Sequence, residues 1–126
     1  MDGHNVLVVD DDADIRSLLV GVLQDEGYEA ESAPNGRDAL AILDRWRADA
    51  IVLDLMMPVM DGWTFVEKLR ERKRDIPIVV LSAATDLSRH ASRLGAVDVI
   101  PKPFDIEALL PRIARLTGGP PASATP

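Results

Sequence analysis

Four short apolar runs, rich in valine and isoleucine, constrain the fold of this chain more than any other feature. They are Val6–Val9, Ala50–Leu53, Ile78–Leu81 and Val97–Ile100. The first three are continuously apolar, which is typical of strands buried on both faces of a parallel sheet. Segments with apolar residues at helical spacing separate the runs. The pattern therefore predicts an α/β fold, with a doubly wound parallel sheet and helical crossovers on both faces.

A fifth strand and five helices complete this pattern. The strand Tyr28–Ala33 carries Glu29 and Glu31, which suits an edge of the sheet, where polar alternation is tolerated. Gly27 can end the first helix, and Asn35-Gly36 marks a turn. The five helices are indicated by these apolar sets: Ile15, Leu18, Leu19, Val22 and Leu23; Ala39, Ile42, Leu43 and Trp46; Trp63, Val66 and Leu69; Leu87, Ala91 and Leu94; Ile106, Leu109, Leu110, Ile113 and Leu116.

Length and composition fit one globular domain. The chain has 126 residues, of which 47% are hydrophobic and 28% charged. The net charge of −7 argues against direct binding of nucleic acid, and the absence of cysteine excludes disulfides and thiolate metal sites. The start lacks the basic region of a signal peptide, and no apolar stretch approaches the ~20 residues that span a bilayer. We therefore expect a soluble, cytoplasmic protein without a membrane partner.

The last residues differ in composition from the rest. From Gly118 the sequence reads GGPPASATP, without any residue that forms a core. We expect one domain over residues 1–117, followed by a flexible tail or the start of a linker over residues 118–126.

Polar residues follow the predicted strands at the points where ligand sites form. In an open parallel sheet, sites lie at the carboxyl ends of the strands. Asp10 and Asp11 follow the first strand, Asp54 the third, Ser82 the fourth and Lys102 the fifth. Neighbouring strands would bring three carboxylates, a hydroxyl and an ammonium group together.

This set of groups favours phosphoryl transfer with a divalent cation. Carboxylates at close range cannot all stay ionised without a counter-charge, and Lys102 supplies only one. Mg²⁺ accepts oxygen ligands such as these, and His4 and His90 are too far apart in sequence to favour a softer metal. A metal and a lysine offset charge on phosphoryl oxygens, and an aspartate can itself be the nucleophile.

Two further aspartates have a simpler interpretation. Asp12 precedes the first predicted helix, where its side chain can accept hydrogen bonds from free N–H groups. Asp14 lies in the first turn, where a negative charge favours the helix dipole. Ser82 alone would be read as a structural hydroxyl and Lys102 alone as a surface residue, so their positions after strands carry the argument.

Four motifs give the chain a recognisable resemblance. VVDDDADIR, VLDLMMPVMDG, VVLSA and PKPF occur in this order over roughly residues 5–117. Together they resemble the receiver domain of bacterial two-component response regulators. The resemblance implies a flavodoxin-like sheet of order 2-1-3-4-5 with five helices, and a phosphorylation-activated signalling switch.

The resemblance also implies a role for each site residue. Asp54 would be the phospho-acceptor, and Ser82 and Lys102 would bind the phosphoryl oxygens. Asp11 would bind Mg²⁺ directly, and Asp10 would act as the second acidic residue. The full ligand set of Mg²⁺ would be Asp10, Asp11, Asp54 and the main-chain carbonyl of Met56.

The implied partners are proteins. A sensor histidine kinase or phosphotransfer protein would donate the phosphoryl group. A downstream protein would bind the surface of the fourth helix, the strand Val97–Ile100 and the final helix, and a homodimer through these elements stays open. The domain would promote its own phosphorylation and slow dephosphorylation without being a turnover enzyme.

Some positions depart from the family pattern. Val99 stands where a tyrosine or phenylalanine usually moves inward on activation, so we expect the output surface to switch by backbone shifts. The segment from Ser82 to Gly95 is about two residues shorter than in many receivers. Met56 and Ala84 are both apolar and cannot orient an attacking water, so we expect slow dephosphorylation.

Two alternative functions follow from the same residues. A phosphate-independent interaction module with the receiver fold is left open by Val99, although the intact site argues against it. A metal-dependent phosphohydrolase would use Asp54 as nucleophile. It would need a second aspartate two residues later, where Met56 stands, and a cap domain that this chain lacks.

Overall fold

A five-stranded parallel sheet forms the centre of the molecule in the computed structural model, which describes residues 4–54, 62–72, 76–82, 98–101 and 105–118. The strand order is β2-β1-β3-β4-β5, as the resemblance implies. The strands are β1 (Asn5–Val9), β2 (Glu29–Ala33), β3 (Ala50–Asp54), β4 (Ile78–Ser82) and β5 (Asp98–Pro101). The predicted doubly wound parallel sheet is confirmed.

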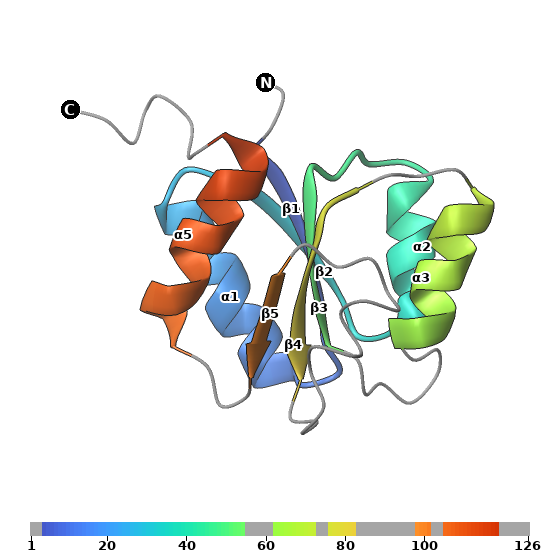
Figure 1. Cartoon of the computed structure of the whole chain (residues 1–126), viewed down its shortest axis with the longest axis horizontal. Coiled ribbons are helices and arrows are strands. Elements are labelled where there is room, and N and C mark those ends of the chain that lie inside the picture. The colour runs from blue at the N-terminus through green and yellow to red at the C-terminus, as the bar shows by residue number, and fades with distance from the viewer. Residues whose placement is uncertain (1–3, 55–61, 73–75, 83–97, 102–104, 119–126) are drawn as a thin grey trace.

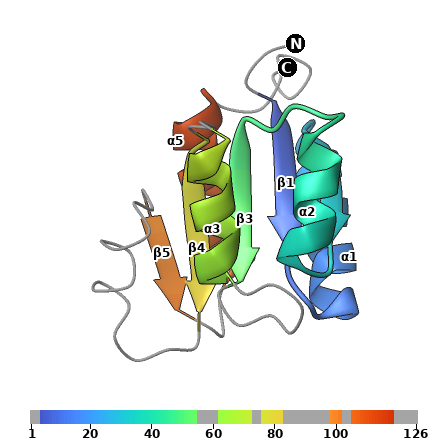
Figure 2. The ribbon, with the colours of Figure 1, turned by 90° about the vertical axis from the view of Figure 1, so that its right-hand side faces the viewer.

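Four helices are seen in the described residues and cover both faces of the sheet. They are α1 (Ala13–Asp25), α2 (Gly36–Leu43), α3 (Gly62–Glu71) and α5 (Ile106–Thr117). Figure 1 shows α1 and α5 on one face and α2 and α3 on the other, and Figure 2 shows α2 and α3 from their own side. The helix predicted around Leu87–Leu94 falls outside the described residues.

The strands divide the core into two apolar clusters, because successive side chains of a strand point to opposite faces. In β1, Leu7 and Val9 pack toward α2 and α3, whereas Val6 and Val8 pack toward α1 and α5. The edge position of β2 agrees with its charged residues, since Glu29 at its start is exposed. The three strands with continuous apolar runs, β1, β3 and β4, are interior.

The ends of α1 follow the predicted local signals. The Asp12 side chain accepts hydrogen bonds from the backbone N–H groups of Asp14 and Ile15, at 2.9 and 3.2 Å. Asp12 is therefore the N-cap, as predicted. After the helix, Gly27 has a φ of 99°, a conformation that costs glycine little.

Some apolar residues lie differently from the simplest helical pattern. Leu18 belongs to the apolar set of α1 but is 51% exposed. Helix α2 ends at Leu43, so Trp46 lies beyond the helix, although it still packs against the core. Phe65 in α3 is fully buried and was not among the predicted core residues, because Trp63 and Val66 suggested a different stripe.

Helix α5 ends at Thr117, and Gly118 follows it in the left-handed conformation, with a φ of 82°. No helix within the described ranges has the length and apolar character needed to cross a membrane.

Candidate functional site

Pairing of the central strands brings two of the predicted site residues to the same level. Val9 of β1 lies opposite Leu53 of β3 in the parallel ladder. The next residue on each strand is an aspartate, Asp10 and Asp54. Two adjacent strands therefore end in a pair of carboxylates at the carboxyl edge of the sheet, where sites form in this class of fold.

Three carboxylates meet at this edge. Oxygens from Asp10, Asp11 and Asp54 all lie within 4.8 Å of one another. Asp10 is 1% exposed and Asp54 is 5% exposed, while Asp11 is open to solvent. Burial and mutual repulsion both disfavour three ionised groups at this distance, so the cluster attracts a cation.

The donor atoms fit Mg²⁺. They are all carboxylate oxygens, which are the ligands of hard divalent cations, and neither histidine nor cysteine joins the cluster among the described residues. One exposed member leaves the cluster accessible from solvent. The same opening would admit the phosphate oxygens and waters that usually complete the coordination of this ion.

Asp10 is held at three of its atoms. Its backbone N–H donates to the carbonyl oxygen of Ala33 at 3.1 Å. Its Oδ1 accepts from the backbone N–H of Asp12 at 2.9 Å. Its carbonyl oxygen accepts from Nη1 of Arg16 at 2.8 Å. The connection between β1 and α1 is thereby fixed to the end of β2 on one side and to the first turn of α1 on the other.

Arg16 was missed in the sequence-based prediction of the site. The available signal was a cationic residue in the first helical turn after three adjacent aspartates. Side chains of a helix tilt toward its N-terminus, so a long side chain at this position reaches back over the preceding loop.

The other predicted site residues are only partly described. Ser82 is the last residue of β4, and Leu81 before it lies opposite Asp54. The backbone of Ser82 is therefore one residue beyond the level of Asp54 on the adjacent strand. Val99 lies opposite Val80 in the ladder between β4 and β5. Met56 and Lys102 lie outside the described residues.

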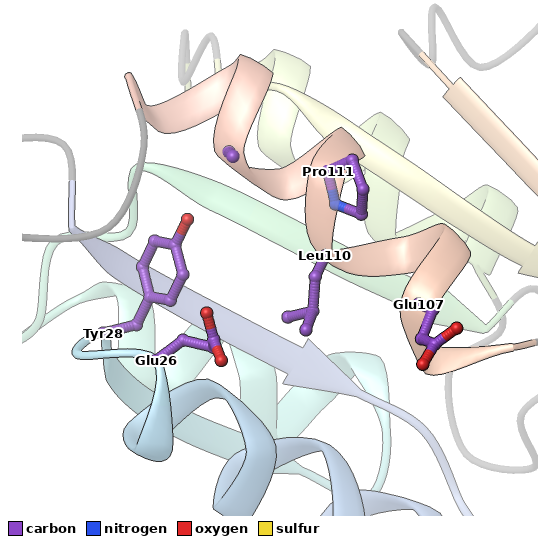
Figure 3. A pocket seen from close by; sticks show the side chains of 6 residues that line it. Glu26, Tyr28, Glu107, Leu110 and Pro111 are labelled. Carbon is purple, nitrogen blue, oxygen red and sulfur yellow. The ribbon is translucent and has the colours of Figure 1, made fainter. Parts of the chain in front are cut away.

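A hollow separate from the acidic cluster lies beside α5 (Figure 3). It has a volume of about 350 Å³ and is lined by Glu26, Tyr28, Glu107, Leu110, Pro111 and Ala114. Its wall is mainly apolar, with two exposed glutamates. None of the predicted site residues lines it.

Comparison with known proteins bears directly on the acidic cluster. Residues 6–114 match the family model of the response regulator receiver domain. The chain belongs to the response regulator receiver family. The cluster of this receiver domain therefore lies in a fold whose members act as phosphorylation switches in two-component signalling.

Relatives of this receiver domain include longer regulators. It is 44% identical over 113 residues to the response regulator MprA of Mycolicibacterium vanbaalenii, covering 88% of this chain and 49% of that protein. It is equally similar to MprA of Mycobacterium leprae, of which it covers 50%. The chain thus spans about half the length of the curated relatives that it matches.

Solved structures of similar receivers agree with the fold. The chemotaxis protein CheY4 of Vibrio cholerae matches with a TM-score of 0.81 and 39% identity, covering 89% of this chain and 97% of that one. The response regulator TrrA of Thermotoga maritima, solved in complex with Mg²⁺ and beryllium fluoride, matches with a TM-score of 0.79 and 34% identity. That match covers 92% of this chain and 99% of TrrA.

Proposed function

We propose that this receiver domain is a switch that accepts a phosphoryl group on Asp54 in the presence of Mg²⁺. The observation that carries the proposal is the convergence of Asp10, Asp11 and Asp54, with oxygens within 4.8 Å of one another at the end of the central strands. Two of the interior strands lead to these residues: Asp10 and Asp11 follow β1, and Asp54 is the last residue of β3. The pairing of β1 with β3 therefore supports the position of Asp54 beside Asp10.

Asp54 acts as the nucleophile in this proposal. A carboxylate oxygen of Asp54 forms a bond to the phosphorus of a phosphohistidine, and the bond from phosphorus to the imidazole nitrogen breaks. The imidazole keeps the electron pair of that bond.

Asp10, Asp11 and the backbone carbonyl of Met56 would complete the protein ligands of Mg²⁺ around Asp54. When bound, this ion offsets negative charge on the phosphoryl oxygens. We assign Ser82 and Lys102 to the same oxygens as hydrogen-bond donors. The place of Ser82 at the end of β4, beside β3, supports its part of this assignment.

Two kinds of protein partner follow from this function. A histidine kinase or phosphotransfer protein donates the phosphoryl group, and we propose that Leu18 contributes to docking it. Leu18 is a large apolar residue with 51% exposure, and it lies about one helical turn after the loop that carries the acidic cluster. A downstream protein binds the region of β5 and α5, with Val99 at the switching surface.

We further propose that the domain accepts one phosphoryl group and loses it slowly, and that it does not turn over a substrate. Apolar Met56 and Ala84 support slow loss, because neither side chain can hydrogen-bond to an attacking water. The phosphate-independent module and the phosphohydrolase are the alternatives to this proposal.

Intact-mass spectrometry tests the proposal on the 126-residue chain. After treatment with acetyl phosphate and Mg²⁺, we expect a gain of one phosphoryl group, which is lost in Asp54→Asn and in the presence of EDTA. Asp12→Asn is the matched control, because it removes a carboxylate from the adjacent loop while asparagine keeps the N-cap. It should be phosphorylated like the natural chain.

The outcome separates the three functions. No gain in mass on the natural chain would favour the interaction module. Continued release of inorganic phosphate, in excess of the protein, would favour the hydrolase. A gain that persists in Asp54→Asn would refute Asp54 as the acceptor.

A further inference from the structure

Arg16 makes a contact that the phosphoryl-transfer chemistry does not use. It lies in the first turn of α1, and its Nη1 donates to the carbonyl oxygen of Asp10, six residues earlier, at 2.8 Å. The side chain is half-buried. Its backbone N–H donates to the carbonyl oxygen of Asp12 at 3.0 Å, which is the first hydrogen bond of α1, so the contact with the loop before the helix comes from the side chain.

The carbonyl group held by Arg16 belongs to the peptide unit that joins Asp10 to Asp11. A peptide unit is planar, so the position of its oxygen sets the direction in which the chain leaves Asp10. Asp10 itself is also held by Ala33 and by the N–H of Asp12. Asp11 is the exposed member of the cluster, and burial does not fix its side chain. Its orientation depends on this peptide plane.

We propose that Arg16 is a positioning residue that orients the peptide between Asp10 and Asp11, and so directs the Asp11 carboxylate toward the cation. The proposal rests on the proposed function, since it takes Asp11 as a Mg²⁺ ligand. Arg16 does not touch the phosphoryl group. It acts through the main chain, as a charged donor to a carbonyl oxygen, a type of hydrogen bond that is stronger than a neutral one.

A purely electrostatic role for Arg16 would have the opposite effect on the metal. A guanidinium near a cation site repels the cation, so removing its charge alone would tighten Mg²⁺ binding. Loss of the positioning contact would instead weaken Mg²⁺ binding. The sign of the change in affinity therefore distinguishes the two roles.

Calorimetric titration with Mg²⁺, without any phosphodonor, measures this sign. We expect the Kd of Mg²⁺ to rise about tenfold in Arg16→Met, which is the effect of losing one hydrogen bond with a charged partner. Arg16→Lys keeps the charge and part of the reach, so its Kd should fall between the two. Arg45→Met is the matched control, because Arg45 is exposed beyond the end of α2 and its loss changes the net charge equally.

Two further measurements separate positioning from a general loss of structure. In NMR spectra of the metal-free protein, the Asp11 amide should shift in Arg16→Met, because it lies on the same peptide plane. In phosphorylation by acetyl phosphate, the Mg²⁺ concentration for half-maximal rate should rise, while the rate at saturating Mg²⁺ is retained. A merely structural role would lower the active fraction and leave that concentration unchanged.

An unchanged or lower Kd in Arg16→Met would overturn the proposal, as would a natural chain that does not bind Mg²⁺. Failure of the proposed function gives a different result. In that case Mg²⁺ binds and depends on Arg16, but the mass spectrum shows no phosphoryl group on Asp54.

Discussion

At the scale of single residues, three carboxylates repel one another in the acidic cluster, and the fold holds them close together. Asp10 and Asp54 are buried, and Asp11 brings a third carboxylate oxygen within 4.8 Å of theirs. The fold accepts this arrangement because hydrogen bonds from the backbone of Asp12 and from Arg16 hold the loop. Three carboxylates at this distance carry an electrostatic cost, which a bound cation would offset.

Neutralising Asp11 should relieve this cost in the absence of metal. We expect Asp11→Asn to raise the free energy of unfolding in EDTA by about 0.5–1 kcal/mol, because one of three mutually repelling charges is removed. Urea denaturation measures the change, which should shrink at high salt as screening weakens the repulsion. A lower free energy of unfolding in EDTA would contradict the interpretation. Glu29→Gln is the control, because Glu29 is exposed at the start of β2, away from the cluster.

Much of the site could be predicted from the sequence, because its aspartates stand at the ends of neighbouring strands. Asp10 and Asp54 directly follow paired strands, so knowing the strands was enough to bring them together. Asp12 was predicted as a cap from its place before a helix. The contact of Arg16 could not be predicted, because it depends on the rotamer of a long side chain and on the path of one loop.

At the scale of elements, α1 joins the site to the surface. Its N-cap Asp12 begins the helix directly beside the acidic cluster, and its buried residues Leu19 and Leu23 pack on the sheet. Leu18 points away from that packing and is exposed. Periodicity predicted the helix but could not assign Leu18 to solvent, because it lies at the border of the apolar stripe. Phe65 was missed for a different reason: it is fully buried beside Val66, one position away from the residues expected to face the core.

A polar change at Leu18 should separate transfer by a kinase from transfer by a small phosphodonor. We expect Leu18→Asp to lower the rate of phosphoryl transfer from the phosphorylated histidine kinases of the source organism by about tenfold, the effect of losing one well-packed apolar contact. Phosphorylation by acetyl phosphate should stay unchanged, because the site is intact. Rates are followed with radiolabelled phosphate.

Ala41→Asp provides the matched control, since Ala41 is exposed on α2, on the other face of the sheet. Equal rates of kinase transfer to Leu18→Asp and Ala41→Asp would remove Leu18 from the docking surface. A loss with acetyl phosphate as well would indicate damage to the site.

At the scale of the whole molecule, the acidic cluster lies at the carboxyl end of two of the most buried strands of the fold. Asp10 and Asp11 follow β1, and Asp54 ends β3; both are interior strands with continuous apolar runs. These strands were also the clearest signal in the sequence, so fold and site were predicted from the same residues. The order of the strands came from the family resemblance, since apolar runs alone do not say which strands are neighbours.

Because the site requires the folded sheet, Mg²⁺ should stabilise the entire domain. A ligand that binds only the native state adds about 2.7 kcal/mol at 100 times its Kd. We expect the Tm to rise with Mg²⁺ concentration in calorimetric scans of the natural chain, and to stay nearly constant in Asp54→Asn. Sodium chloride of equal ionic strength is the control. An equal rise with sodium chloride would assign the effect to screening.

The two apolar clusters on either side of the sheet have a consequence for how such a domain can diversify. Residues of separate clusters pack on opposite faces of the sheet, so substitutions more than about 7–10 Å apart in the two clusters should have additive effects. The surface of α2 and α3 can then be redesigned without retuning that of α1 and α5. Because the sheet separates the two apolar clusters, each face could be redesigned to bind a new partner while the acidic cluster stays unchanged.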